Sequence, residues 1–437
     1  MGKLKVGFSR ILLDPPLGLH ISGYYNVRAG SGVLDDLTAS CIAFSDGERT
    51  AVIIGMDVIG IEQSTGDRLR EVVSERTGLP ADAILYSCTH THTAPGINDN
   101  LCRGDDIYNN VLFRRLGDLA AAALEDLSDA ELYGAHGSVE GIAFIRRFRM
   151  KNGNTQTNPG FLNPDIVAPI STPDETLQLL RIIREGKNDV VLINFQVHPD
   201  VVGGTQYSAD YPGWVRRSFE GAVSGTKCVY FNGTQGDTNH IDFLSPAREY
   251  GYAHSRHMGL TIAAEAMKLY SYPAKIEGDR VDYCLREVMV PANLAPESAL
   301  PQAERFIALH EAGKDDEIPF GRMELITVVA EAYRIRRRAA GEDSIPLHLS
   351  AVRFGNAVLT GFPGEPFTDV GRAVRAASPF SMTMTSCCAN GYEGYFPMKD
   401  AFAEGGYEAR SSDFHAGVAE LLAEETKKML QELYRKQ

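Results

Sequence analysis

Five apolar stretches of this sequence end in polar side chains that bind metals or move protons in other proteins, and this repeated pattern is the strongest constraint on the fold. Strands buried on both faces are nearly continuous apolar runs, and each stretch fits that description. The five pairs are Ala83–Tyr86 before His90 and His92, Val190–Val197 before His198, Cys228–Phe231 before a glycine-containing turn, Val358–Gly361 before Glu365, and Met382–Ser386 before Tyr392 and Tyr395.

The first pair carries the clearest metal signal. His90 and His92 stand two residues apart, and Pro95 and Gly96 then turn the chain. In an extended segment, residues i and i+2 point to the same face, so both imidazoles are expected on one side of a strand end. Paired imidazoles at the exit of a buried strand suit a divalent metal, most often zinc. Taken alone, the pair is equally well explained as two histidines in a surface loop.

The other four segments each have an ordinary structural explanation as well as a chemical one. His198, before a proline, is a second metal-ligand candidate, but single buried histidines are often core residues. Gly233 and Gly236 permit close backbone approach to a ligand. Glu365 could bind a metal or act as a base, or it could interact with the dipole of a following helix. Tyrosines in such loops, as at Tyr395, mostly serve packing.

Strand-like and helix-like segments interleave along the whole chain. This pattern predicts an α/β fold with a mixed β-sheet flanked by helices, in one domain spanning 1–437, with a helical elaboration at about 295–340. Residues Arg149 to Asp174 show little periodicity and are expected to form a long loop, which in compact domains is often functional.

Composition and charge limit the partners. The chain has 437 residues, 44% of them apolar, and a net charge of −14. A nucleic-acid binder needs a basic face, so nucleic acid is not an expected partner, and the charge says nothing specific about the substrate. The longest apolar run, Ala51 to Ile61, is too short to span a bilayer and contains Asp57, so no stable membrane anchor is expected.

The expected compartment is the cytoplasm. The N-terminus has no apolar leader segment. Seven cysteines at scattered spacings, without a Cys-x-x-Cys motif, are typical of free thiols in a reducing compartment. The sequence does not define the oligomeric state. A homo-oligomer stays open because symmetric dimers are common.

Six motifs follow one another in a characteristic order. They are Thr-His-Thr-His-Thr-x-Pro-Gly, Asn-Phe-x-x-His, Asn-Gly-x-x-Gly-Asp, Pro-Gly-Glu, Ala-Asn-x-Tyr-x-x-Tyr and Gly-Tyr-Glu-Ala. This order resembles the catalytic domain of the neutral/alkaline ceramidases, zinc amidases that cleave the N-acyl bond of ceramide. The resemblance runs from about Gly7 to the C-terminus. It implies a ceramidase-like fold without the C-terminal immunoglobulin-like domain of the family.

The resemblance also implies a zinc ion and its ligands. On the matching motifs, the four ligands implied are His90, His198, Glu365 and Tyr395. Two neutral imidazoles and a carboxylate leave zinc with net positive charge and room for water. A zinc ion so held lowers the pKa of bound water to about 7 and polarises a carbonyl.

Four further residues are implied as catalytic. His92 matches a histidine near the scissile bond and is a candidate proton shuttle. Arg146 and Tyr407 match an arginine and a tyrosine on the substrate side. Asn239 stands where the family has a serine, and Ile145 where it has an asparagine. The loss of the serine favours direct attack by zinc-bound hydroxide, with Asn239 as a hydrogen-bond donor.

The sequence leaves three functions open. The first is a zinc-dependent hydrolase that cleaves an amide bond, in a soluble small molecule rather than in membrane ceramide. The second is a metal hydrolase of the amidohydrolase barrel type, in which a His-x-His motif follows the first strand. The third is a metal- or ligand-binding relative without activity, which the absence of the family serine suggests.

Overall fold

The computed structural model describes residues 3–97, 105–247, 250–339 and 341–435. Its largest element is a nine-stranded sheet with the order β14-β12-β11-β6-β1-β3-β4-β5, in which β16 also pairs with β6. The strands are β1 Lys5–Leu12, β3 Thr38–Ser45, β4 Thr50–Met56, β5 Ile84–Cys88, β6 Ser128–Ser138, β11 Thr176–Arg184, β12 Asp189–Phe195, β14 Thr226–Asn232 and β16 Ala274–Ile276.

A second sheet packs against the first. It has the order β17-β18-β19-β21, formed by Val281–Pro291, Ser344–Phe354, Ala357–Gly361 and Met382–Ser386. The rings of Phe44 in β3 and Phe354 in β18 stack at 4.4 Å inside the core between the two sheets. The second sheet covers the inner face of the central strands, which is why β4 and β5 are apolar almost throughout.

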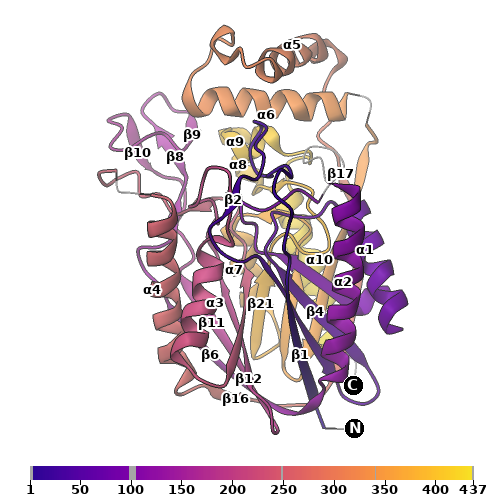
Figure 1. The fold of residues 1–437 in the computed structure, drawn as a ribbon. Helices are drawn as coiled ribbons and strands as arrows, with labels where there is room; N and C mark the ends of the chain where they lie inside the picture. The colour runs from indigo at the N-terminus through magenta and orange to yellow at the C-terminus, as the bar shows by residue number, and fades with distance from the viewer. Residues whose placement is uncertain (1–2, 98–104, 248–249, 340, 436–437) are drawn as a thin grey trace.

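Helices cover both outer faces, so the molecule has four layers (Figure 1). On the large sheet, α1 Gln63–Thr77 and α2 Asp106–Glu125 pack over β3, β4 and β5. The other half of this face is covered by α3 Asp210–Ala222 and α4 Tyr252–Tyr270. On the small sheet lie α7 Thr368–Ala377 and α10 Val418–Arg435. The predicted mixed α/β class is confirmed, and its division into two facing sheets was not foreseen.

Strand directions exclude the barrel alternative. Pairs β1–β3, β3–β4 and β11–β12 are antiparallel, whereas β4–β5, β12–β14 and β19–β21 are parallel. A (β/α)8 barrel needs eight parallel strands, each followed by a helix. The amidohydrolase-barrel hypothesis is therefore wrong.

Two helices rise above the sheets at the top of Figure 1. They are α5 Leu300–Glu311 and α6 Arg322–Arg338, in the region near 295–340. The short helical turns η2 Glu297–Ala299 and η3 Asp315–Glu317 precede them. The pair has a small core of its own, and Tyr25 from the N-terminal part of the chain packs against it.

The expectation of a long loop over Arg149 to Asp174 is wrong. This region contributes to a three-stranded sheet formed by β8 Arg147–Met150, β9 Thr155–Thr157 and β10 Ile166–Pro169. Strands this short contain too few residues to show an alternating pattern. Phe148 and Met150 anchor the sheet on Phe243.

The remaining elements are short and connect the larger ones. They are β2 Gly32–Val33, η1 Ala81–Ala83, β7 Phe144–Ile145, β13 Gln206–Tyr207, β15 Thr238–Asn239, β20 Glu365–Pro366, β22 Tyr395–Phe396, α8 Lys399–Glu404 and α9 Tyr407–Ser411. Among the described helices, none has the length and apolarity that a bilayer crossing requires. The six described cysteines are free thiols, and Cys102 lies outside the described residues.

Candidate metal centre

The candidate site lies where strand ends from both sheets meet. The backbone N–H of Cys88, at the end of β5, donates to the carbonyl of Cys388 at 3.1 Å. The N–H of Cys387 donates to the carbonyl of Asn232, at the end of β14, at 3.0 Å. These bonds tie β5 and β14 of the large sheet to the segment after β21 of the small sheet. The segments that follow these strands therefore share one small volume.

His90 enters this volume with one ring nitrogen available. Its Nδ1 lies 2.6 Å from the carbonyl oxygen of Ile59, which can only accept, so Nδ1 carries the proton. Its Nε2 is buried and has no hydrogen-bond partner. A buried imidazole nitrogen with a free lone pair, oriented by a carbonyl on the other nitrogen, has the environment of a metal ligand.

The backbone at His90 differs from the predicted extended segment. Its φ is +71°, a left-handed conformation that is uncommon outside glycine. The alternation argument for His90 and His92 is therefore wrong in its geometry. The two imidazoles are nevertheless neighbours, with ring centroids 5.0 Å apart and planes at 89°.

Glu365 and His198 face the free nitrogen of His90. The Glu365 Oε2 lies 3.4 Å from His90 Nε2 and 3.6 Å from His198 Nδ1. All three side chains are almost fully buried. Ligand atoms of a tetrahedral zinc ion, each about 2.0–2.1 Å from the metal, are about 3.3 Å from one another. The spacing between these residues fits that separation.

His92 lies on the other side of His198. The two Nε2 atoms are 3.1 Å apart, and His92 Nδ1 is 3.6 Å from Asp200 Oδ1. Gly23 permits this packing, because a Cβ there would lie 2.5 Å from His92 Nδ1. We assign the His92 proton to Nδ1, which faces the carboxylate, and so His198 Nε2 donates to His92. That leaves His198 Nδ1 as an acceptor facing Glu365.

His90, His92 and His198 form a buried cluster that could hold a metal ion. Burial lowers the pKa of both His92 and His198 well below the usual range, and neighbouring positive groups lower it further. These two imidazoles are therefore neutral near pH 7, the form that binds metals. One ring nitrogen of His198, Nε2, faces His92, and the other, Nδ1, faces Glu365.

The Glu365 carboxylate is held from several directions. Gln235 Nε2 donates to Oε2 at 3.2 Å, and the Tyr392 hydroxyl donates to Oε1 at 3.1 Å. Burial alone raises the pKa of Glu365, but His90 and Arg146 outweigh it, so the pKa lies below its usual value. Gly236 is required beside the backbone of Glu365, since a Cβ there would lie 2.4 Å from the main-chain carbonyl oxygen of Glu365.

Tyr395 is brought to Glu365 by strand pairing. The two residues are direct partners in the parallel pair β20–β22. Burial and the charge of Glu365 raise the pKa of Tyr395 well above its usual value. The ring lies 5.3 Å from the Arg146 guanidinium carbon and 5.6 Å from the Tyr407 ring. The fourth predicted ligand thus lies next to the carboxylate.

Arg146 is buried at the same place. Its Nε donates to Glu408 Oε1 at 2.6 Å, and Nη2 donates to the carbonyl of Gly236 at 3.0 Å. Nη1 lies 3.4 Å from His198 Nδ1. A guanidinium fixed in this way can present positive charge to a substrate oxygen without moving.

The other two predicted catalytic residues differ in position. Tyr407, at the start of α9, is hydrogen-bonded to Tyr25 and lies beside Tyr395. Asn239 makes two side-chain hydrogen bonds: Nδ2 donates to Asn158 Oδ1 at 2.9 Å, and Oδ1 accepts from Ile241 N–H at 2.9 Å. One of the two Nδ2 protons is thereby used, so the expected donor role would fall to the second.

Several site residues were missed by the sequence interpretation. Asp200 follows His198 by two residues, so the sequence His-Pro-Asp carried a signal. Tyr24, whose hydroxyl donates to Asp200, and Glu408, which pairs with Arg146, had no recognisable signal. Gln235 lies in the glycine-containing turn that was singled out only for its backbone.

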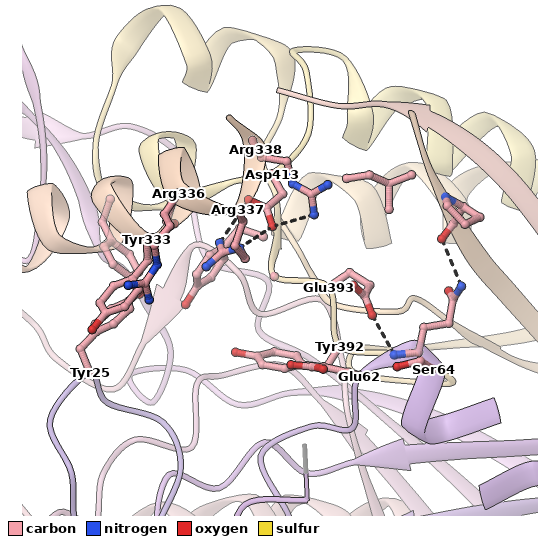
Figure 2. A pocket seen from close by; sticks show the side chains of 17 residues that line it. Tyr25, Glu62, Ser64, Tyr333, Arg336, Arg337, Arg338, Tyr392, Glu393 and Asp413 are labelled. Atoms are coloured by element: carbon pink, nitrogen blue, oxygen red, sulfur yellow. Dashed lines mark hydrogen bonds and ion pairs between the residues drawn. The ribbon is translucent and has the colours of Figure 1, made fainter. Parts of the chain in front are cut away.

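A pocket of about 670 Å³ opens next to the site (Figure 2). Tyr392, Tyr395 and Tyr407 line it on the side of Glu365. Tyr25 and Tyr333 stack at 5.4 Å in its wall. Tyr392, which donates to Glu365, and Tyr395, its strand partner, therefore border both this pocket and the candidate metal centre.

Comparisons with known proteins agree with this architecture. No family model matches the chain, and no curated protein matches its sequence. Among solved structures, neutral ceramidase from Pseudomonas aeruginosa matches with a TM-score of 0.76 over 99% of this chain and 75% of that chain, at 17% identity. The chain has the fold of a neutral ceramidase. A ceramidase complexed with C2 matches equally, with a TM-score of 0.76 at 16% identity over 100% of this chain and 76% of that chain. The ceramidase fold predicted from the order of motifs is thereby confirmed.

One histidine of this ceramidase fold outside the cluster gives a prediction about pH. Burial lowers the pKa of His240 to about 4. An unfolded histidine titrates near 6.5, so the unfolded chain binds more protons between pH 6.5 and 4. The free energy of unfolding therefore falls as the pH drops through this range, by about 3 kcal/mol from this residue. Urea unfolding of the wild type and His240→Asn at pH 7 and 4.5 measures this loss in the free energy of unfolding.

The difference between the wild type and His240→Asn isolates the contribution of His240, because the other buried histidines are present in both proteins. His415 is exposed, and His415→Asn should leave the pH dependence unchanged. Parallel pH profiles for the wild type and His240→Asn would contradict the assignment.

Proposed function

We propose that this protein is a zinc-dependent amidase that cleaves the N-acyl bond of a soluble small molecule. The observation that carries the proposal is the unpartnered, buried Nε2 of His90, which lies 3.4 Å from Glu365 Oε2. The order of motifs along the chain and the ceramidase fold support the same function.

The hydrogen bonds favour one ligand set over the cluster of three histidines. His90 Nε2 has no hydrogen-bond partner and faces Glu365 Oε2, which in turn faces His198 Nδ1, whereas His92 accepts from His198 and faces Asp200. His90, His198 and Glu365 would therefore hold the zinc, with Tyr395 beside Glu365 as a fourth group. Zinc bound there would activate a water molecule and polarise the amide carbonyl.

The residues around this set have separate roles in amide cleavage. His92 is neutral near pH 7 and is oriented by Asp200, so it can take up a proton and pass it to the departing amine. Arg146 is held by Glu408 and presents positive charge to the carbonyl oxygen. Tyr407 lies beside Tyr395 at the pocket wall and contacts the substrate there.

A small soluble substrate fits the pocket better than a lipid. Six of its lining residues are ionisable acids or arginines: Glu62, Arg336, Arg337, Arg338, Glu393 and Asp413. Burying an alkyl chain against charged groups removes water from them without replacing its hydrogen bonds. From the similar ceramidase structures we therefore carry over the cleavage of an amide bond, but not the lipid nature of the substrate.

The test combines metal analysis with a substrate panel. Metal-replete wild type is expected to contain about one zinc per chain. It should release amine from short N-acyl compounds faster than alcohol from matched esters, and should cleave a fluorogenic N-acyl sphingosine poorly. Ceramide turnover above that of all the short amides would contradict the substrate. Stable zinc without any turnover would identify a non-catalytic metal-binding relative.

The Tyr392 hydroxyl gives a prediction about metal affinity. Tyr392→Phe removes the 3.1 Å hydrogen bond that orients Glu365 and leaves the ring in place. Loss of such an orienting contact typically weakens metal binding 10- to 100-fold. Competition with a zinc-binding dye measures the dissociation constant. Tyr283→Phe, on the edge strand β17 of the second sheet, is a matched control. Equal affinities of the wild type and Tyr392→Phe would show that Glu365 needs no support from this hydroxyl.

A further inference from the structure

The pocket beside the metal centre has an arginine-rich end. Arg336, Arg337 and Arg338 come from the last turn of α6, and Figure 2 shows them with Asp413 across the pocket from Tyr392 and Glu62. Basic residues at a helix C-terminus favour the helix dipole, which explains their presence but not their concentration on a cavity.

The three arginines are not equally paired. Arg337 makes two contacts of 3.1 Å with Asp413, one through Nε and one through Nη2. Arg338 reaches the same carboxylate only at 3.5 Å, and its Nε is buried without a hydrogen-bond partner. Asp413 is thus shared by two guanidinium groups and is oriented by the first.

Arg336 also has N–H groups that are not used in a close ion pair. Its Nη1 is 4.0 Å from Glu304 Oε2, and both side chains are more than 40% exposed, so the attraction is weak. Its guanidinium carbon lies 4.9 Å from the centre of the Tyr333 ring, which forms the pocket wall. Stacking on an aromatic ring orders a guanidinium while its in-plane N–H groups stay available.

Two further acids of the lining, Glu62 and Glu393, are associated with the start of α1. Glu393 accepts from the backbone N–H of Gln63 at 2.8 Å, and burial raises its pKa. Glu62 and Gln63 lie at the start of α1, whereas the arginines belong to α6. The pocket therefore has the three arginines with Asp413 on the α6 side, and Glu62, Glu393 and Tyr392 on the α1 side.

We infer that the substrate carries an oxyanion group, a carboxylate or a phosphate, remote from the scissile amide, and that Arg336 and Arg338 bind it. The inference rests on the proposed amidase function, since Tyr392 and Tyr395 line the same pocket as these arginines and adjoin Glu365 of the metal site. Arginine forks match carboxylate and phosphate geometry. On a chain with a net charge of −14, a local cationic end is needed to retain an anion.

Coumarin amides test this inference in the metal-replete full-length protein. The acyl groups are succinyl, glutaryl and adipyl, each compared with its uncharged primary-amide counterpart and with an ω-amino counterpart. N-Acetylglutamate and N-acetylglutamine test the amine side. We expect the anionic member of each set to have at least about tenfold higher kcat/KM than its neutral and cationic counterparts, mainly through a lower KM. This is the gain expected from one pair of charge-assisted hydrogen bonds. Equal or better cleavage of the neutral or cationic members would overturn the inference.

Arginine variants locate the preference. Arg336→Gln and Arg338→Gln should each reduce the anion preference severalfold by raising KM. Arg305→Gln, an exposed change on α5 outside the pocket lining, should leave it unchanged. A preference that survives the double variant Arg336→Gln/Arg338→Gln would place the anion elsewhere and overturn the inference.

A binding measurement separates this inference from the proposed function. Calorimetric titration of the wild type with glutarate, with inorganic phosphate and with uncharged glutaramide needs no turnover. Binding of glutarate or phosphate that is lost in the double variant supports the anion site even if no amide is cleaved, and shows which oxyanion is preferred. Amide cleavage without anion binding in this assay would overturn the site and leave the amidase proposal intact.

Discussion

Glu365→Gln is expected to abolish zinc retention and reduce amide hydrolysis by at least about 10²-fold, since residues that only orient a ligand already cost 10- to 100-fold. The substitution keeps the shape of the side chain but removes the charge that faces His90 Nε2 at 3.4 Å and His198 Nδ1 at 3.6 Å. A neutral amide oxygen is a much weaker zinc ligand than a carboxylate. Elemental analysis after dialysis, together with the rate on the best amide of the panel, measures both effects.

Two controls make this prediction decisive. Glu297→Gln is an exposed change of the same kind and should retain zinc and activity. His90→Ala should lose zinc as Glu365→Gln does, with unchanged circular dichroism. If Glu365→Gln kept its zinc but lost activity, Glu365 would act on a proton rather than on the metal. If the wild type held no zinc after metal-replete purification, the hydrolase proposal itself would be contradicted.

Arg216→Met is expected to lower the free energy of unfolding by about 3–5 kcal/mol. Arg216 Nη1 and Nη2 donate to the two oxygens of Asp57 at 2.9 and 2.5 Å, and both side chains are buried. Methionine fills the space but leaves the Asp57 carboxylate without its counter-ion in the core. Asp57 precedes Val58 and Ile59, whose carbonyls accept from the backbone and ring of His90. Urea unfolding measures the loss, and zinc titration measures its effect on the metal site.

The double variant Asp57→Asn/Arg216→Met removes both charges and should recover much of this loss, because the remaining cost is that of a buried amide. Arg217→Met on the same helix, where the side chain is 38% exposed, should cost less than about 1 kcal/mol. A small effect of Arg216→Met would show that Thr38 and Thr89, which also bond Asp57, can hold the carboxylate alone.

The sequence predicted the α/β class because long buried strands and helices have strong periodic patterns. It did not predict two facing sheets, because a strand covered by helices and a strand covered by another sheet both read as continuous apolar runs. The stacking of Phe44 on Phe354 joins segments that no local pattern relates. The strands β8, β9 and β10 were predicted as a loop because they are too short to show an alternating pattern.

The candidate site was predicted as a set of residues but not as an arrangement. His90, His198, Glu365 and Tyr395 were singled out because each follows an apolar strand, and they were named as ligands from the order of motifs. The structure brings them close to one another. The left-handed backbone at His90 and the contact of Asp200 with His92 depend on tertiary packing. Asn239 was chosen from its motif position alone, which gave no sign of its hydrogen bonds to Asn158 and Ile241.

The meeting of strand ends from both sheets has a consequence for synthesis on the ribosome. A nascent chain that has reached β14 already contains His90 and His198, but Glu365 and the Cys388 segment that ties the two sheets together emerge much later. Such a chain can offer imidazoles to a metal but not the Glu365 carboxylate, which leaves a weak and poorly shielded site. Stable uptake of the proposed zinc would therefore be a post-translational event, and zinc occupancy would report that the last third of the chain has docked.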